Sequence, residues 1–405
     1  MTPLTIADPE LFGVTESSCT LSFAVHDAAG AVDAHAEVLV DGVPRALSAG
    51  VAGTRLVRVE GLAPGTRHEI AIVAEDGTRA ASDRFFASVV DTLPGTGAHP
   101  VASFATLNDL HFGEPRFGGT LQADGSYGAE AAGYPAVRDD DGDVPYWQIM
   151  NEDAVADINS AGVDFVVIKG DIADSGRREQ FAAAADTFAG FAMPWHAFLG
   201  NHDYYGLLAG KEVDGYELLG QPPTPRTIDV AGWRLVLIDT VEPGAHHGIF
   251  PDARLRWLED ALEETRAAAI PTLVMSHHQP VPHRFADRFP NTIAIVPAHS
   301  LRLFELLGRH PQVKAVLIGH THQNRVRRYP ESGGVPFIEV NCVKDYPGGF
   351  AHYRLFDDGT FRQEVRRTSS QRALAHSTRC RDFFAGGYRR FALGNLADRS
   401  FVAGG

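Results

Sequence analysis

The chain has 405 residues, of which 44% are hydrophobic, and this is enough for two domains or for one large domain with an appendage. Its formal net charge of -15 argues against a nucleic-acid partner, because nucleic acids normally bind a basic surface. No apolar run is long enough to cross a bilayer, and the first residues lack the basic and then apolar pattern of a secretory signal. We therefore expect a soluble, cytoplasmic protein that binds neither nucleic acid nor membrane.

Residues 1–92 alternate apolar and polar residues in the way that is typical of half-buried strands. The clearest runs are 19–25, 37–41, 57–60 and 69–72, and turns containing Gly or Pro separate them. Short strands at this spacing predict a small β-sandwich. The segment 62–70 resembles the turn-to-strand signature of fibronectin type III domains, with His68 where that family usually has tyrosine. The resemblance implies a fibronectin type III or immunoglobulin-like sandwich and leaves the subfamily open.

A linker rich in Pro and Gly, 93–100, precedes a second region, 100–368, in which apolar runs alternate with helical patterns. We expect strands at 101–107, 164–168, 194–199, 272–275 and 313–318 and two strands within 226–240, and helices at 147–161, 178–191 and after a cap at Asp252. This alternation predicts an α/β domain with a mainly parallel sheet. The long loop 112–145, rich in Gly and Asp, is interpreted as a lid over a site, with a disordered segment as the alternative.

The C-terminal tail, 369–405, is basic and aromatic. We expect it to pack on the preceding domain; a contact with substrate or with a second copy of the chain is the alternative, so a homo-oligomer stays open. The three cysteines, Cys19, Cys342 and Cys380, are an odd number and lie far apart. We interpret them as buried free thiols and expect no disulfide framework.

Five short polar clusters follow apolar runs of the second region, at 108–111, 170–174, 200–203, 276–278 and 319–322. The carboxyl ends of strands are where α/β sheets expose functional groups. The clusters supply Asp, Asn and His side chains and no Cys, a ligand set that suits Mn, Fe or Zn. Two such metal ions need about six to eight protein ligands, and the clusters supply that number.

Taken in order, the clusters resemble the signature of the calcineurin-like metallophosphoesterase superfamily, D-x-H, G-D-x-x-D, G-N-H-[DE], a lone H and G-H-x-H. The resemblance implies a four-layer αββα sandwich, two divalent metal ions and a bridging role for Asp171. The other implied ligands are Asp109, His111 and His322 for one ion and Asn201, His277 and His320 for the other. His277 is preferred to His278 because it directly follows the apolar strand. The same pattern implies that His202 is the general acid and that Asp174 orients it.

Two departures narrow the resemblance to one branch of the superfamily. Purple acid phosphatases carry tyrosine where this chain has Asp174, and protein Ser/Thr phosphatases carry arginine where it has Ser175. The G-D-x-x-D-S-G form with G-N-H-D and H-H-x-P is closer to bacterial cyclic-nucleotide and glycerophosphodiester phosphodiesterases, although Gln279 replaces their usual proline. The implied activity is hydrolysis of small phosphodiesters, 3′,5′-cyclic nucleotides or glycerophosphodiesters, by a metal-bridging hydroxide.

Four residues on loops near the predicted ligands are expected to contact the phosphate-ester substrate: His278, His283, Asn324 and Tyr346. The same metal site would also serve a phosphomonoesterase or a nucleotide pyrophosphatase. An alternative of another class is a non-catalytic module that binds a phosphorylated ligand. Such a module would have no need of His202.

Overall fold

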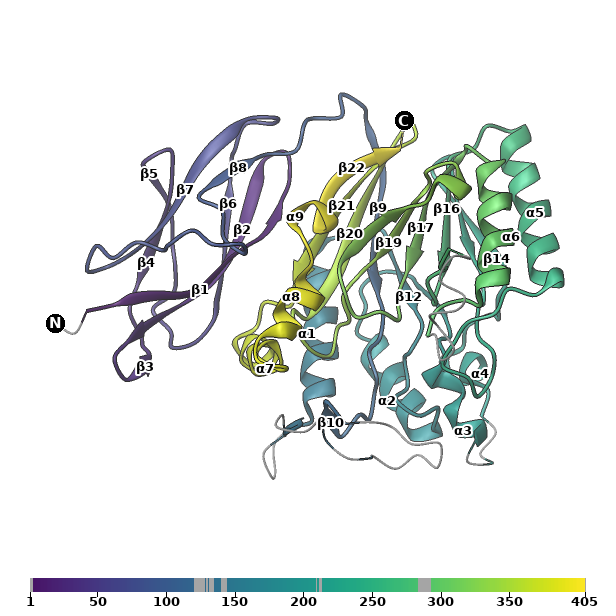
Figure 1. The fold of residues 1–405 in the computed structure, drawn as a ribbon, viewed down its shortest axis with the longest axis horizontal. Helices are drawn as coiled ribbons and strands as arrows, with labels where there is room; N and C mark the ends of the chain where they lie inside the picture. The colour runs from purple at the N-terminus through teal and green to yellow at the C-terminus, as the bar shows by residue number, and fades with distance from the viewer. Residues whose placement is uncertain are drawn as a thin grey trace.

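The computed structural model describes residues 3–119, 128, 130, 135–139, 144–208, 210, 213–282 and 293–404. Its N-terminal part contains two four-stranded antiparallel sheets (Figure 1). One sheet is formed by β1 (Thr5–Val14), β2 (Ser18–Asp27), β3 (Gly30–Ala31) and β6 (Arg55–Glu60), and the other by β4 (Ala36–Val40), β5 (Val43–Leu47), β7 (Arg67–Ala74) and β8 (Val89–Asp91). Residues of both sheets, including Phe23 and Ile72, share one core. The predicted all-β region is confirmed.

The second region contains two six-stranded sheets. The first has the order β13 (Trp195–Phe198), β12 (Phe165–Lys169), β9 (Pro100–Leu107), β20 (Gly349–Phe356), β21 (Thr360–Arg367) and β22 (Ser400–Gly404). The second has the order β14 (Arg226–Val230), β15 (Trp233–Leu237), β16 (Thr272–Ser276), β17 (Val313–Ile318), β19 (Pro336–Glu339) and β18 (Arg325–Arg328). The expected mainly parallel sheet is corrected to two mixed sheets, because β14, β18 and β20 to β22 all join antiparallel.

Helices cover the outer faces of both sheets. The helices α1 (Tyr146–Ala161), α2 (Arg178–Phe188) and α4 (Gly215–Leu219) share a core with the first sheet, and α5 (Asp252–Ala267) and α6 (Pro297–Gly308) share one with the second. The inner faces meet in a third core that includes Phe104, Tyr353 and Leu273. The four-layer arrangement is therefore confirmed. Asp252 does not cap α5 as predicted; it is the first helical residue, and its carboxylate accepts a hydrogen bond from Arg302.

No helix in the described part of the chain combines the length and apolar character that spanning a membrane requires. All three cysteines are buried and free, as predicted.

The C-terminal tail links the two regions. It forms α7 (Gln371–Arg381), α8 (Gly387–Leu393), α9 (Leu396–Arg399) and then β22, which completes the first six-stranded sheet by pairing with β21. Arg389 Nε donates to Glu10 Oε1 at 2.8 Å, and Arg399 Nε donates to the backbone oxygen of Phe12 at 2.7 Å. Figure 1 shows the tail helices between the N-terminal sheets and the two six-stranded sheets. The tail therefore contacts both regions.

Glu364 on β21 is a buried carboxylate at the boundary between the regions. Its oxygens accept hydrogen bonds from Arg58 of β6 and, at 2.9 Å, from Arg366. Burial alone would raise the pKa of Glu364, but His352, Arg366 and Arg58 outweigh it and hold the pKa well below its usual range. The charged form of Glu364 therefore stabilises the folded protein.

We expect a Glu364→Gln variant to lose about 2 kcal/mol of unfolding free energy at pH 7, because a buried charged hydrogen-bond network is weakened. A depressed pKa contributes stability above the unfolded value of about 4.3, and that stability is lost as the pH falls below it. The difference between wild type and variant should therefore shrink between about pH 5 and pH 3. Urea unfolding at several pH values measures it, with the exposed Glu37→Gln as control. A difference that grows on acidification would contradict this account.

Candidate metal centre

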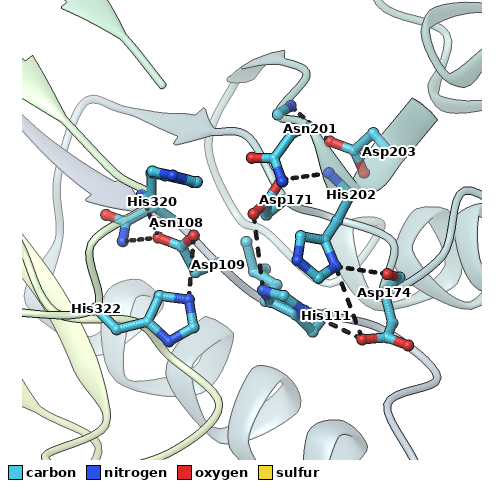
Figure 2. Close-up of polar contacts among 12 residues, drawn as sticks. Asn108, Asp109, His111, Asp171, Asp174, Asn201, His202, Asp203, His320 and His322 are labelled. Carbon is cyan, nitrogen blue, oxygen red and sulfur yellow. Dashed lines mark hydrogen bonds and ion pairs between the residues drawn. The ribbon is translucent and has the colours of Figure 1, made fainter. Parts of the chain in front are cut away.

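The five polar clusters lie at the carboxyl ends of five strands, three in the first sheet and two in the second. Asp109 and His111 follow β9, Asp171 follows β12, Asn201 and His202 follow β13, His277 follows β16, and His320 and His322 follow β17. The strand β12 pairs in parallel with β9 and β13 in the first sheet, and β16 pairs in parallel with β17 in the second. Because the sheets pack face to face, the five loops meet at one edge, as Figure 2 shows for residues from four of them.

Asp171 lies at the centre of this cluster and is fully buried. Its Oδ2 is 3.2 Å from His277 Nε2 and 3.8 Å from His111 Nε2, and its Oδ1 accepts the backbone N–H of His202 at 2.9 Å. His277 Nε2 also lies 3.1 Å from Asn201 Oδ1. The carboxylate therefore lies between His111, which follows a strand of the first sheet, and His277, which follows a strand of the second.

Asp109 joins the remaining predicted ligands to this centre. Its Oδ1 lies 3.4 Å from His322 Nε2, and its Oδ2 accepts the backbone N–H of His320 at 2.8 Å. The ligand atoms of Asp109, His111 and His322 all lie within 4.8 Å of one another, as do those of Asp109, Asp171 and His277. The structure therefore brings the seven predicted ligands into one buried cluster.

The backbone at the cluster is strained. Five of the seven predicted ligands have a positive φ, between 45° and 67°: Asp109, His111, Asp171, His320 and His322. A left-handed conformation costs a residue with a Cβ atom about 1–2 kcal/mol. Such strain persists where the surroundings fix the conformation, and it concentrates at functional sites.

Two glycines let the loops approach one another. A Cβ atom on Gly170, whose φ is 86°, would lie 2.7 Å from both Gly200 N and His277 Nδ1. A Cβ atom on Gly200 would lie 2.2 Å from Asp171 Oδ1. No other residue fits there without moving a predicted ligand. The glycines of the G-D and G-N-H-D motifs are thus required by close packing.

The donor atoms of the cluster fit a divalent cation. Asp109 Oδ1, His111 Nε2 and His320 Nε2 are buried and have no hydrogen-bond partner among the described residues. Each such atom costs about 1–3 kcal/mol unless a ligand satisfies it. Burial lowers the pKa of His111 and lowers that of His320 to about 3, so both imidazoles are neutral, the form that binds metal.

His277 is the exception among these imidazoles. Burial alone would lower its pKa, but Asp171 and Asp109 outweigh that effect and raise the pKa to about 9. Its Nδ1 lies 2.8 Å from the backbone oxygen of Lys169, which directs Nε2 toward Asp171. The proton on His277 Nε2 thus lies between this nitrogen and the Asp171 carboxylate, and a bound cation would take the place of that proton.

His202 lies beside the cluster with its ring orientation fixed. Its Nδ1 is 2.7 Å from the backbone oxygen of Asp174. Because a carbonyl oxygen only accepts, Nδ1 carries a proton and Nε2 remains for proton exchange. The Asp174 carboxylate lies 4.0 Å from His202 Nδ1 and only 3.2 Å from His111 Nδ1. Asp174 thus contacts His202, as the prediction requires, mainly through its backbone oxygen, and its carboxylate lies closer to His111 (Figure 2).

A family model described as calcineurin-like phosphoesterase matches residues 103–324, which is more than half of the chain and contains every predicted ligand. The chain belongs to the calcineurin-like phosphoesterase family. Membership makes it a metal-dependent phosphoesterase, and a two-metal site is typical of this family.

Relatives of known name match the same part of this phosphoesterase. It is 29% identical over 218 residues to the 3′,5′-cyclic adenosine monophosphate phosphodiesterase CpdA of Pseudomonas aeruginosa, covering 51% of this chain and 75% of that protein. It is 31% identical over 213 residues to a probable cyclic nucleotide phosphodiesterase of Rhodopseudomonas palustris, covering 50% and 70%. It is 31% identical over 186 residues to the glycerophosphodiester phosphodiesterase GpdQ of Enterobacter lignolyticus, covering 45% and 65%.

An open hollow of about 850 Å³ adjoins the metal centre of this phosphoesterase. Predicted ligands and His202, whose side chain is 21% exposed, form one wall. Glu114, Lys344 and aromatic residues of the tail also line the hollow. The hollow is the place where a substrate can reach both the ligands and His202.

Three of the residues expected to contact substrate are described, and none of the three lines this hollow. His278 is fully buried, with Nδ1 2.9 Å from Thr240 Oγ1, and its ring packs edge-on against His277 and tilted against His320. Asn324 donates from Nδ2 to the backbone oxygen of Ala392 at 3.1 Å. Tyr346 is buried and donates its hydroxyl to Glu10 at 2.6 Å. The substrate-contact role of these three residues therefore stays a prediction that the lining of the hollow does not support.

Two further predictions concern residues outside the described ranges. His283 lies outside them. So does much of the loop 112–145, which was interpreted as a lid. Its described part includes β10 (Arg116–Phe117) paired with β11 (Val137–Arg138).

The sequence analysis missed Asp345 and Tyr388, which support a predicted ligand. Asp345 Oδ2 lies 3.5 Å from His322 Nδ1, and its Oδ1 accepts the Tyr388 hydroxyl at 2.8 Å. Asp345 follows the apolar strand β19 as the five clusters follow theirs, and this signal could have found it. Tyr388 belongs to the tail and has no comparable signal.

We expect Tyr388→Phe to weaken metal binding by about tenfold, because partners that orient a ligating histidine typically contribute 10–100-fold to affinity. Competition with a chelator during Mn²⁺ titration measures the change. Tyr329→Phe is the matched control, since Tyr329 packs in the core beside α6. Equal affinities in Tyr388→Phe and wild type would show that Asp345 does not need this hydroxyl to hold His322.

Proposed function

We propose that this chain is a dinuclear-metal phosphodiesterase that hydrolyses small phosphodiesters, with 3′,5′-cyclic nucleotides and glycerophosphodiesters as the leading substrates. The observation that carries the proposal is the position of His202, fixed by Asp174 at the rim of a hollow whose wall contains the predicted ligands. A protein that only bound phosphorylated ligands would not need an imidazole held in this way. The names of the relatives agree in class with a phosphodiesterase.

The cluster divides into two groups that would hold the two ions. Asp109, His111 and His322 would hold one, Asn201, His277 and His320 the other, and Asp171, between them, would contact both. The Asp, Asn and His donors suit Mn, Fe or Zn. When bound, two such cations supply Lewis-acid chemistry, by making water a stronger nucleophile and neutralising charge on the phosphoryl oxygens.

The residues of the chain supply proton transfer and rigidity. As the ester P–O bond breaks, the leaving alkoxide takes a proton from Nε2 of protonated His202. The attacking water gives up a proton to solvent and the ring regains one from solvent, so that diester and water become alcohol and phosphomonoester. The Asp174 backbone oxygen keeps the ring aligned throughout. Asp203 fixes the same turn by accepting the backbone N–H groups of Gly200 at 2.8 Å and Ala173 at 2.7 Å.

The charge on the hollow favours a diester over a monoester. Lys344 is the one lysine or arginine among the described residues that line it. Its Nζ lies 2.6 Å from both carboxylate oxygens of Glu114, so its charge is already paired. A phosphomonoester carries a second negative charge, and no unpaired lysine or arginine among the described lining residues would neutralise it. A phosphodiester carries one negative charge and needs no such residue.

The test is turnover of an aryl phosphodiester against the matching aryl phosphomonoester, on protein stripped of metal and reloaded with Mn²⁺. We expect diester hydrolysis that requires metal and exceeds monoester hydrolysis. The stripped protein is the control for metal dependence. A preference for the monoester would move the assignment to a phosphatase, and two bound ions without turnover of either ester would favour a binding module.

A further inference from the structure

One part of the lining of the hollow is aromatic. It is formed by Phe117 of β10 and by Phe383, Phe384, Tyr388 and Phe391 of the tail, and we call these five residues the aromatic wall. The four tail residues lie outside the part of the chain that the family model matches. Phe384 is 51% exposed and Phe391 is 47% exposed, although both line a hollow that also contains predicted ligands.

We propose that the aromatic wall is a subsite for a planar aromatic group on the substrate, so that nucleoside phosphodiesters are preferred over glycerophosphodiesters. This inference rests on the proposed function and narrows its substrate class. Two of the five rings, those of Phe384 and Phe391, are about half exposed where they line the hollow, and exposed apolar side chains beside a site offer a binding surface. Bases of any sequence stack on such rings through their π faces.

The inner rings of the aromatic wall pack on one another. The Phe117 ring lies 5.2 Å from Phe383 and 5.1 Å from Tyr388, between ring centroids, and the planes are tilted by 62° and 53°. Phe384 packs edge-on against Phe383 at 4.6 Å, and Phe391 stacks on Tyr388 at 6.0 Å. These tilted pairs fix the ring orientations and leave the outer rings half-exposed toward the hollow.

The N-terminal region and the metal centre both anchor the aromatic wall. Tyr388 donates to Asp345, which supports His322 on the ligand side. The next residue, Arg389, donates to Glu10 at 2.8 Å and lies 3.9 Å over the ring of Phe85. The wall is therefore held before substrate arrives, and a preformed surface loses little conformational entropy on binding.

The chemistry of the wall discriminates between the two leading substrate classes. The paired Lys344 and Glu114 leave few free hydrogen-bonding groups among the described residues of this wall, so glycerol hydroxyl groups would gain little there. A purine or pyrimidine would instead exchange hydration for stacking on Phe384 or Phe391. We therefore expect the base to contribute to binding independently of the phosphate.

The first test compares adenosine 3′,5′-cyclic phosphate with the cyclic phosphate of 1,3-propanediol, which has the same six-membered ring and no base. Wild type should prefer the nucleotide in kcat/KM by about tenfold or more, and Phe384→Ala with Phe391→Ala should reduce that preference by about tenfold. Phe391→Trp should keep it. Leu47→Ala is the control, because Leu47 is a 64% exposed side chain on β5 of the N-terminal region.

The second test needs no turnover. Saturation-transfer NMR on metal-free protein should detect adenosine bound through its base protons, and the double variant should lose the signal. Equal hydrolysis of both cyclic phosphates with no adenosine signal would overturn the subsite and leave the proposed function standing. Hydrolysis of neither, with an adenosine signal that the double variant loses, would overturn the proposed function and leave the subsite standing.

Discussion

An Asp171→Asn variant should fold normally, bind fewer than two metal ions per chain and lose phosphodiester turnover by more than about 100-fold. The Asp171 carboxylate lies beside a histidine of each group, 3.8 Å from His111 and 3.2 Å from His277. Loss of partners that merely orient ligands already costs 10–100-fold, so loss of a shared ligand should cost more. An amide has one acceptor oxygen and no charge, and it cannot hold two cations.

Metal content after dialysis against Mn²⁺ measures this prediction, with circular dichroism as the check on folding. Asp157→Asn is the matched control, since Asp157 is a partly buried carboxylate on α1 that accepts hydrogen bonds from Ser369. Two ions retained in Asp171→Asn would show that the carboxylate is not shared between them.

A His202→Ala variant should keep both metal ions and lose kcat by about 10²–10⁴-fold, the usual contribution of a general acid. His202 is not one of the seven predicted ligands: its Nδ1 is held by the backbone oxygen of Asp174, and its Nε2 is assigned to proton transfer. The loss should be larger for an alkyl than for a nitrophenyl leaving group, since a weakly basic phenolate leaves without a proton.

Steady-state rates with both leaving groups, on wild type and variant of equal metal content, measure this prediction. A purely structural role for His202 would lower both rates by the same factor. The same loss for alkyl and nitrophenyl diesters would therefore contradict the assignment of His202 as the acid.

The metal centre was predictable because its signals are local. Each cluster directly follows a buried strand, and parallel strands deliver their carboxyl ends to one edge of a sheet. Asp171 and His277 could thus be placed together although they come from different sheets. The α/β alternation also gave the helices near their observed bounds, for example 147–161 against Tyr146–Ala161.

The structural features that the sequence did not predict depend on contacts between residues far apart in the chain. Glu10 lies in an N-terminal strand, and nothing near it indicates pairing with Arg389, 379 residues along the chain. The same carboxylate takes the hydroxyl of Tyr346, which local sequence had placed at the substrate. β22 joins a sheet begun by β9, so the mixed topology was not readable from periodicity. Asp174 acts on His202 through its backbone, which residue type cannot show.

The aromatic C-terminal tail illustrates both what the sequence predicts and what only the structure reveals. Its composition predicts packing, and Tyr388 and Phe383 are buried. Only the structure places the same segment at a hollow that predicted ligands also line, because that position depends on Asp345 and on the N-terminal region. The N-terminal region therefore helps to hold the tail residues that line the hollow.

The most direct measurement of the central claim is a calorimetric titration of metal-free protein with Mn²⁺, with aryl phosphodiester turnover recorded at each step. We predict two ions bound per chain and turnover that reaches its maximum only when the second site is filled. Saturation at one ion, or turnover unchanged by metal, would contradict a two-metal phosphodiesterase.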